Sequence, residues 1–197
     1  AAQRLQGEAA DPDAARMAAT IWDEAQHLNV ILEEFLSLAR PSTQPKIRID
    51  LADIVTLVAQ MAELESSRSG VSITLDARGA QPISGNPDEL RKAVWNILAN
   101  SLAATPSGGH IRVMVDRDGS HAVLTVDDTG TGITVDDLAK VFQPWFTTKP
   151  KGTGLGLAIT HRIVTDHGGT ITVVSPPPEA LSGTRVVVRF PVVVADR

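Results

Sequence analysis

The chain has 197 residues, a length that suits one domain with an appendage or two small domains. Its hydrophobic content of 43% and charged content of 21% are those of a globular protein, and no apolar run reaches the roughly 18 residues that a membrane-spanning helix needs. A net charge of -5 gives no general affinity for nucleic acid, and the absence of cysteine excludes disulfides and cysteine-ligated zinc.

A long helix is expected near the N-terminus, between Asp11-Pro12 and Arg40-Pro41. Aspartate is a favoured N-cap, proline suits the first helical position, and a residue that precedes proline disfavours helix. Apolar residues recur along this helix at alternating spacings of four and three: Ile21, Ala25, Leu28, Leu32, Phe35 and Ala39. This seam is typical of a helical bundle shared with a second chain. Packing against the chain's own globular domain is the alternative.

After a linker at Pro41–Pro45, the pattern changes to mixed strands and helices. Strands are expected at Lys46–Asp50, Val71–Asp76, Ile111–Asp116, Ala122–Asp127, Thr170–Ser175 and Thr184–Pro191. Helices are expected from the N-cap Asp50 to Ser69, from the N-cap Asn86 to Ala104, and over Gly154–Asp166. Because strands cluster late and helices are interspersed, we predict an α+β fold, a two-layer sandwich of a mixed, mostly antiparallel sheet with helices on one face.

The segment Val141–Thr160 joins an aromatic stretch, a Thr-Thr-Lys triplet and a glycine-rich turn that leads into an apolar helix. Glycines let backbone N–H groups approach an anion, and the N-terminus of the following helix favours negative charge. The segment therefore predicts a phosphate site. Glycine-rich turns also occur in ordinary loops, so this prediction depends on a base site and a metal site elsewhere in the chain.

Two asparagines, Asn96 and Asn100, lie four residues apart in the helix expected to begin at Pro87, so they share one face. A carboxamide oxygen suits a Mg²⁺ ion that arrives with a triphosphate, because it ligates the metal without adding negative charge. Taken alone, two asparagines on a helix are more often surface or capping residues.

The segment Asp127–Ile133 follows an alternating strand and turns sharply through Gly130 and Gly132. A carboxylate at a strand end can accept a hydrogen bond from an exocyclic amino group, which would distinguish adenine from guanine. A surface Asp-Gly turn is the alternative for this segment alone. The ordered combination of paired asparagines, this turn, an aromatic Thr-Thr-Lys segment and the glycine-rich turn is hard to explain as separate surface loops.

These motifs resemble the ATP-binding domain of sensor histidine kinases, within the superfamily shared with type II topoisomerases and mismatch-repair ATPases. The resemblance covers about Pro41–Val194 and implies the Bergerat ATP-binding fold. The matching segments are the N box Asp88–Pro106, the first glycine box Asp128–Ile133, the F box Phe142–Lys149, the second glycine box Gly152–Leu157, and the closing segments His167–Ser175 and Gly183-Thr184.

The resemblance implies a role for each matched position. Asn100 would ligate Mg²⁺, and Asn96 would support the phosphates of ATP. Asp128 would hold the amino group of adenine, with Thr184 behind it. The other nucleotide contacts would come from the glycine boxes and from a lid that closes over the triphosphate: Gly130, Gly132, Thr147, Thr148, Gly152, Gly154, Leu155 and Gly156.

The resemblance also implies the type of reaction. Lys149, with Lys151 nearby, would offset charge on the transferred phosphoryl group, so the implied catalytic residues are Asn96, Asn100 and Lys149. Hydrolysing relatives carry glutamate where Asn96 stands. Because a neutral histidine nitrogen is already nucleophilic and needs no strong base, phosphotransfer to histidine is favoured over hydrolysis.

Two positions depart from the family pattern. Trp145 stands where phenylalanine is usual, and Ser101 stands where the N box usually has alanine. Neither residue is expected to touch a proposed ligand of the nucleotide.

Residues 1–41 resemble part of the dimerisation and phosphoacceptor hairpin of these kinases, and residues 42–197 resemble the catalytic domain. Asp13–Arg40 is similar to the second helix of the hairpin, and Ala1–Leu5 to the end of the first, which would place the acceptor histidine before Ala1. His27 lacks the acidic and polar neighbours of an acceptor site, and His167 is expected to cap a helix. The fragment is thus expected to bind Mg²⁺-ATP without phosphorylating itself.

Two partners are implied by the resemblance: a second copy of the chain, through the hairpin of the full-length parent, and the receiver domain of a response regulator. The lack of cysteine is compatible with a reducing, cytoplasmic compartment, and we expect no nucleic acid partner and no membrane contact by this piece. Membrane anchorage of the parent is left open. Two other functions are left open as well, an ATPase that works as a conformational clamp and a scaffold without kinase activity.

Overall fold

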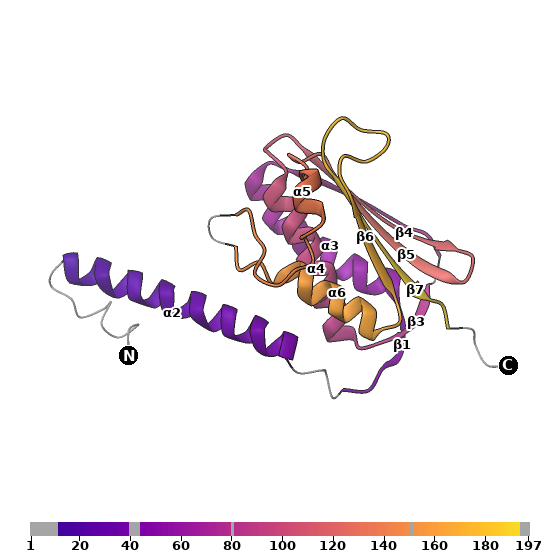
Figure 1. Cartoon of the computed structure of the whole chain (residues 1–197), viewed down its shortest axis with the longest axis horizontal. Coiled ribbons are helices and arrows are strands. Elements are labelled where there is room, and N and C mark those ends of the chain that lie inside the picture. The colour runs from indigo at the N-terminus through magenta and orange to yellow at the C-terminus, as the bar shows by residue number, and fades with distance from the viewer. Residues whose placement is uncertain (1–11, 40–43, 80, 150–151, 194–197) are drawn as a thin grey trace. The chain divides into compact units, whose positions relative to one another are not determined.

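The computed structural model describes residues 12–39, 44–79, 81–149 and 152–193 (Figure 1). The chain divides into two compact units, Ala1–Pro41 and Ser42–Arg197. Over the described parts of both units, no helix combines the length and the apolar character that a bilayer crossing requires.

The described part of the first unit is the helix α2 (Pro12–Ala39), 28 residues long. The predicted helix is therefore confirmed, although its expected cap Asp11 and its expected stop at Arg40-Pro41 lie outside the described residues. Side chains of the predicted seam are exposed in this chain: Ile21, Leu28, Leu32 and Phe35. The helix thus carries an apolar face that the single chain leaves open to solvent.

The second unit is built on a five-stranded sheet with the order β2-β4-β5-β7-β6. The parallel pair is β2 with β4, and the other neighbours are antiparallel. The predicted mixed, mostly antiparallel sheet is confirmed. The strands span β2 (Ser72–Ala77), β4 (His110–Asp118), β5 (His121–Asp128), β6 (Thr170–Val174) and β7 (Thr184–Pro191).

Three helices pack on one face of this sheet: α3 (Leu51–Ser69), α4 (Pro87–Ala104) and α6 (Gly156–Asp166) (Figure 1). Alternate residues of the central strands are fully buried beneath these helices and form the core with apolar side chains of α4 and α6: Ile111, Val113, Leu124, Val126, Leu90, Ile97, Leu98 and Ile159. The α+β two-layer class is confirmed. Every second residue of the strands is buried, and the face that these residues form packs against the apolar faces of the helices.

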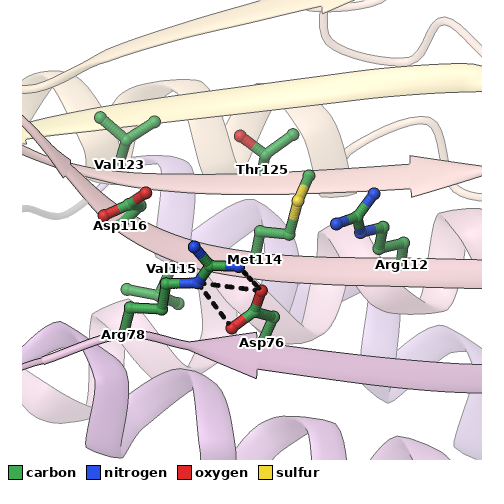
Figure 2. A pocket seen from close by; sticks show the side chains of 8 residues that line it. All are labelled: Asp76, Arg78, Arg112, Met114, Val115, Asp116, Val123 and Thr125. Atoms are coloured by element: carbon green, nitrogen blue, oxygen red, sulfur yellow. Dashed lines mark hydrogen bonds and ion pairs between the residues drawn. The ribbon is translucent and has the colours of Figure 1, made fainter.

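Among the described residues of the second unit, no helix covers the opposite face of the sheet. Figure 2 shows a pocket there, at the surface of β2, β4 and β5, where the guanidinium of Arg78 donates to the carboxylate of Asp76 at 2.7 Å. Arg112, Met114 and Thr125 also line it. None of the residues predicted to bind nucleotide lines this pocket.

The starts of two helices follow their predicted caps. Asp50 precedes α3, and its carboxylate accepts from the N–H of Ala52 at 2.9 Å. Asn86 precedes α4, and its side-chain oxygen accepts from the N–H of Asp88 at 2.9 Å. Gly70 ends α3 with φ of 70°, a conformation that glycine adopts without strain. Local capping chemistry therefore fixes where the helix that carries both asparagines begins.

Three features differ from the sequence prediction. A strand β3 (Pro82–Gly85), which was not expected, pairs antiparallel with β1 (Ile47–Asp50) in a separate two-stranded sheet. A one-turn helix, α5 (Val135–Leu138), was not expected either. The last helix begins at Gly156 and not at Gly154, because Gly154 has φ of 71°, outside the right-handed helical region.

Candidate functional site

Asp128 is the last residue of β5, and it is 6% exposed. Its Oδ1 atom accepts hydrogen bonds from the backbone N–H groups of Gly130 and Thr184, each at 3.0 Å. Thr184 is the residue that faces Asp128 across the β5–β7 pair. The structure therefore brings together the predicted base-binding carboxylate, the first glycine turn and Thr184, which are far apart in sequence.

Ser101 adds a contact that the sequence analysis ruled out. Its side chain is buried on α4, near enough to the carboxyl group of Asp128 to stabilise its charged form. Burial raises the pKa of Asp128, and the hydrogen bonds from Gly130 and Thr184, together with Ser101, offset part of that rise because they stabilise the charged form. The expectation that Ser101 touches no proposed ligand was wrong. Its position four residues after the buried Ile97 was the signal that it faces inward.

Asn96 and Asn100 lie one turn apart on α4 and are both half-buried. The Nδ2 atom of Asn96 donates to the backbone carbonyl of Gly156 at 3.0 Å, at the start of α6. The Oδ1 atom of Asn100 accepts from Nζ of Lys149 at 2.9 Å. The predicted catalytic set is thus assembled from α4 and the segment before α6, with both asparagine side chains engaged.

The chemistry of this cluster fits a metal that arrives with its own ligands. A lysine can only donate, so its partner on Asn100 must be the carboxamide oxygen, the atom type that Mg²⁺ prefers. The ammonium group of Lys149 therefore lies where a metal ion would contact the oxygen of Asn100. Within the described residues there is no group of three or more His, Cys, Asp or Glu side chains that could hold a metal ion. At this cluster the neutral oxygen of Asn100 is the candidate ligand, and the remaining ligands would be phosphate oxygens and water.

The F box and the second glycine box meet through their backbones. The N–H of Trp145 donates to the carbonyl of Gly154 at 3.0 Å, and Trp145 itself has φ of 70°, a conformation that is rare for a bulky residue. A Cβ atom at Gly154 would lie 2.5 Å from the carbonyl carbon of Trp145. Trp145 thus contacts a proposed nucleotide ligand, which corrects the expectation from sequence.

The predicted lid residues beside this contact are more exposed. The hydroxyl of Thr147 accepts from the N–H of Lys149 at 3.1 Å, and Thr148 and Gly152 are exposed. Lys151, the second expected basic residue, lies outside the described residues. Lys149 is half-buried, since its side chain turns back to Asn100.

The N-terminus of α6 lies beside the asparagine pair. Leu155 precedes the helix, is fully buried, and makes no side-chain capping bond to the first turn. The first N–H groups of a helix have no intrahelical acceptor and favour an anion. Because the Asn96 amide is bonded to Gly156 at this end, α4 and α6 together frame the predicted phosphate position.

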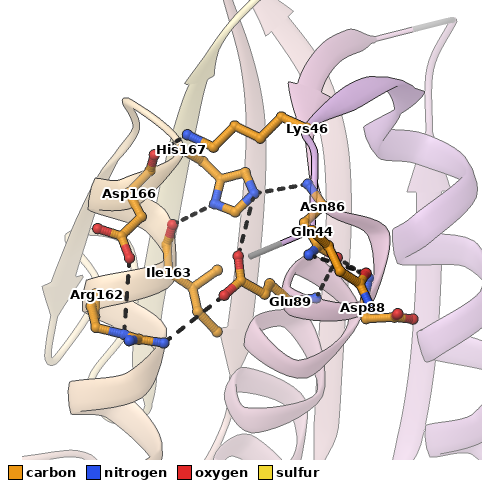
Figure 3. Close-up of polar contacts among 9 residues, drawn as sticks. All are labelled: Gln44, Lys46, Asn86, Asp88, Glu89, Arg162, Ile163, Asp166 and His167. Atoms are coloured by element: carbon orange, nitrogen blue, oxygen red, sulfur yellow. Dashed lines mark hydrogen bonds and ion pairs between the residues drawn. The ribbon is translucent and has the colours of Figure 1, made fainter. Parts of the chain in front are cut away.

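His167 joins the same two helices at their other ends (Figure 3). It follows α6 as its C-cap, and its Nδ1 atom donates to the carbonyl of Ile163 at 2.7 Å. Its Nε2 atom accepts from the backbone N–H of Asn86 at 2.9 Å, which assigns the neutral tautomer. Glu89 and Arg162 add an ion pair at 3.9 Å between the helices. The predicted capping role of His167 is confirmed, and the bridge to α4 extends it.

Three comparisons with known proteins agree with this geometry. Residues 85–194 match the model of the histidine kinase-, DNA gyrase B-, and HSP90-like ATPase family. Sensor histidine kinase ZraS of Escherichia coli (strain K12) is 34% identical over 164 residues, which are 83% of this chain and 35% of that protein. The chain therefore spans about a third of the length of this curated relative.

Solved structures share the fold. The mycobacterial sensor histidine kinase MprB superposes with a TM-score of 0.67 at 29% identity, over 75% of this chain and 97% of that chain. Histidine kinase ThkA, solved in complex with response regulator protein TrrA, superposes with a TM-score of 0.74 at 20% identity, over 97% of this chain and 55% of that chain.

The family match covers more than half of the chain, from the last residue of β3 to just beyond β7. The chain therefore belongs to the family of histidine kinase-, DNA gyrase B-, and HSP90-like ATPases. The resemblance to the ATP-binding catalytic domain of sensor histidine kinases is confirmed, both by relatives of that class and by the fold.

Proposed function

We propose that this chain is the catalytic part of a sensor histidine kinase and transfers the γ-phosphoryl group of ATP to a histidine. The observation that carries the proposal is Asn96, whose carboxamide bonds to Gly156 beside the predicted phosphate position. A carboxamide cannot act as the general base that activates water. A neutral histidine needs no such base, because its nitrogen is already nucleophilic.

In this proposal each part of the cluster has one task. The carboxylate of Asp128 accepts a hydrogen bond from the adenine amino group, and the N-terminus of α6 binds phosphate oxygens. Asn100 ligates Mg²⁺, which neutralises charge on the phosphates when bound. The acceptor nitrogen forms a bond to the γ-phosphorus as the bond to the β–γ bridging oxygen breaks. Lys149 offsets the charge that develops on the transferred group.

The acceptor histidine lies outside the ATP-binding unit in this proposal. His167 is buried and bonded through both ring nitrogens, and both ring nitrogens of His110 bond to hydroxyls of Ser72 and Thr74 at 2.9 and 3.0 Å. His161 packs on Phe142, with ring centroids 5.1 Å apart. The side chain of His27 is outside the described residues, and the sequence around it does not resemble an acceptor site.

The partners are proposed from the same class of protein. The exposed apolar face of α2 supports its assignment as the second helix of a dimerisation hairpin, which would pair with a second copy in the full-length parent. ThkA, which shares this fold, was solved with a response regulator, and this supports a receiver domain as the partner that takes the phosphoryl group onward.

The test supplies the missing acceptor. The chain is mixed with a separate helical hairpin that carries a phosphoacceptor histidine, and radiolabelled ATP and Mg²⁺ are added. We expect acid-labile phosphate on the hairpin and none on the chain itself, and no labelling with Asn100→Ala.

Steady release of inorganic phosphate without transfer would indicate the ATPase clamp instead. Failure to bind nucleotide in calorimetry would indicate a scaffold. Labelling of the chain alone would contradict an external acceptor.

A further inference from the structure

We propose that the ammonium group of Lys149 holds the cation position of the nucleotide-free site, so that Mg²⁺ and Lys149 compete for the same oxygen of Asn100. This inference rests on the proposed function, because it takes Asn100 as the metal ligand. It goes beyond that function by giving Lys149 a second task before nucleotide arrives.

The contact that carries the inference is direct. Nζ of Lys149 lies 2.9 Å from Oδ1 of Asn100, and the two residues are 49 positions apart in the chain. A Mg²⁺ ion would sit about 2.1 Å from the same oxygen, within about 5 Å of an ammonium group that stayed in place. Two cations at that separation in a half-buried site repel strongly, because the low local dielectric screens them little. Metal binding at Asn100 therefore requires Lys149 to leave.

The surroundings make this departure feasible. Lys149 is half-buried, so its ammonium group has given up part of its hydration to reach Asn100. The negative charge of Asp128 keeps the position attractive to a positive charge. When nucleotide and Mg²⁺ enter together, the phosphates give the displaced ammonium a fully charged partner, and charge-assisted hydrogen bonds are stronger than one to a neutral amide.

The backbone of Lys149 is held separately from its side chain. The backbone N–H of Lys149 is bonded to the hydroxyl of Thr147 at 3.1 Å, in a turn at the end of the F box. Release of the side chain from Asn100 requires no change in this turn. The same side chain then becomes available to the transferred phosphoryl group.

The experiment compares ADP binding by the whole chain with Mg²⁺ and with a chelator, in calorimetry, for the natural protein and for Lys149→Met. The measured quantity is the ratio of the two dissociation constants, which reports how strongly Mg²⁺ promotes binding. The ratio reports only interactions that differ between the two states, and in this proposal Lys149 stays on Asn100 when ADP binds without Mg²⁺ and leaves it when Mg²⁺ binds. Without its competitor, Mg²⁺ should promote binding about tenfold more in Lys149→Met than in the natural protein, equivalent to about 1.4 kcal/mol.

A matched control removes a lysine outside the cluster. Lys140 is exposed, and its ammonium group lies 5.9 Å from the ring centroid of Phe146, so Lys140→Met makes the same charge change nearby. Its ratio should equal that of the natural protein, and Lys149→Arg, which restores the cation, should return towards that value. Equal ratios for Lys149→Met and the natural protein would overturn the competition while leaving the proposed function intact. Absence of ADP binding by the natural protein would overturn both.

Discussion

Asp128, the carboxylate proposed to bind adenine, is buried at a cost in stability. One of its oxygens is occupied by two backbone N–H groups, those of Gly130 and Thr184. Burial raises its pKa, which means that the folded protein disfavours the charged form. For an acid with a raised folded-state pKa, the penalty is fully present above that pKa and vanishes as pH falls below the unfolded value. A site that needs this negative charge therefore tolerates lower stability at neutral pH.

The substitution Asp128→Asn separates the contribution of the carboxylate to nucleotide binding from its cost in stability. The carboxamide oxygen can still accept from both backbone N–H groups, while its amino group would face the adenine amino group as a second donor. We expect ADP affinity to fall roughly 10- to 150-fold, the equivalent of about 1.5–3 kcal/mol for a lost charged hydrogen bond. The melting temperature at pH 7.5 should be equal or higher, and the difference should disappear as pH falls below about 4. Calorimetry and thermal melts measure the two effects.

Asp127 provides the control for this prediction because it is the adjacent residue in the same strand. Its carboxylate pairs with Arg185 at 2.6 and 2.8 Å. Asp127→Asn should lower stability slightly, by up to about 1 kcal/mol, and leave ADP affinity unchanged. A loss of stability for Asp128→Asn, or equal losses of affinity in the two variants, would contradict the assigned role of Asp128.

At the scale of elements, two glycines near the start of α6 differ in backbone conformation and in the space available for a side chain. Gly154 has φ of 71°, and an added Cβ would meet backbone atoms of Trp145 and Phe146 at 2.5 and 2.8 Å. Gly156 is already helical, and an added Cβ would lie 3.7 Å from the Cγ atom of Asn96, an ordinary contact. The first glycine is therefore required by the fold, and the second is not.

This difference predicts opposite effects of the same chemical change. Gly154→Ala should destabilise the protein by more than about 1 kcal/mol, since backbone atoms cannot move aside as a side chain can. Gly156→Ala should leave stability unchanged or raise it by up to about 1 kcal/mol, because alanine favours helix. Denaturant unfolding of the two variants measures both. Equal stabilities would show that the backbone contact between the F box and the second glycine box can adjust to an added Cβ atom at low cost.

The elements that the sequence predicted well carry local signals. The capping residues Asp50, Asn86 and Gly70 mark helix ends by their own chemistry, and alternation marks the long strands. The strand β3 lacks such a signal, because it has four residues, begins with a proline and pairs with β1 more than thirty positions earlier. The helix α5 has only four residues, too few to show a helical period.

The candidate nucleotide cluster was predictable as a set of residues but not as a set of contacts. Motif order pointed to Asn96, Asn100, Asp128 and Lys149. The contact of Ser101 with Asp128 crosses from α4 to β5, and the contact of Lys149 with Asn100 depends on how the segment before α6 folds back. Such pairings follow from tertiary packing, which no local pattern contains.

At the scale of the molecule, the two compact units differ in how much of their apolar surface is buried. The unit Ser42–Arg197 contains its own apolar core between the sheet and three helices. In the described part of the other unit, α2, the seam side chains Ile21, Leu28, Leu32 and Phe35 are left exposed. A lone helix gains little stability in water without tertiary packing of its apolar face. The natural chain should therefore self-associate through α2, and its nucleotide site should not depend on that association.

The double substitution Leu28→Glu with Leu32→Glu tests this separation. Both leucines are more than half exposed, at 64% and 54%, so the change introduces no buried charge within the chain. Light scattering should show concentration-dependent dimers of the natural chain at tens of micromolar and monomers of the variant, because charge on the seam opposes helix pairing. ADP affinity should be the same in both, since the base site and the asparagine pair lie within the second compact unit. A monomeric natural chain at every concentration would show that α2 alone is insufficient for association. A weaker ADP affinity in the variant would show that the two units are coupled.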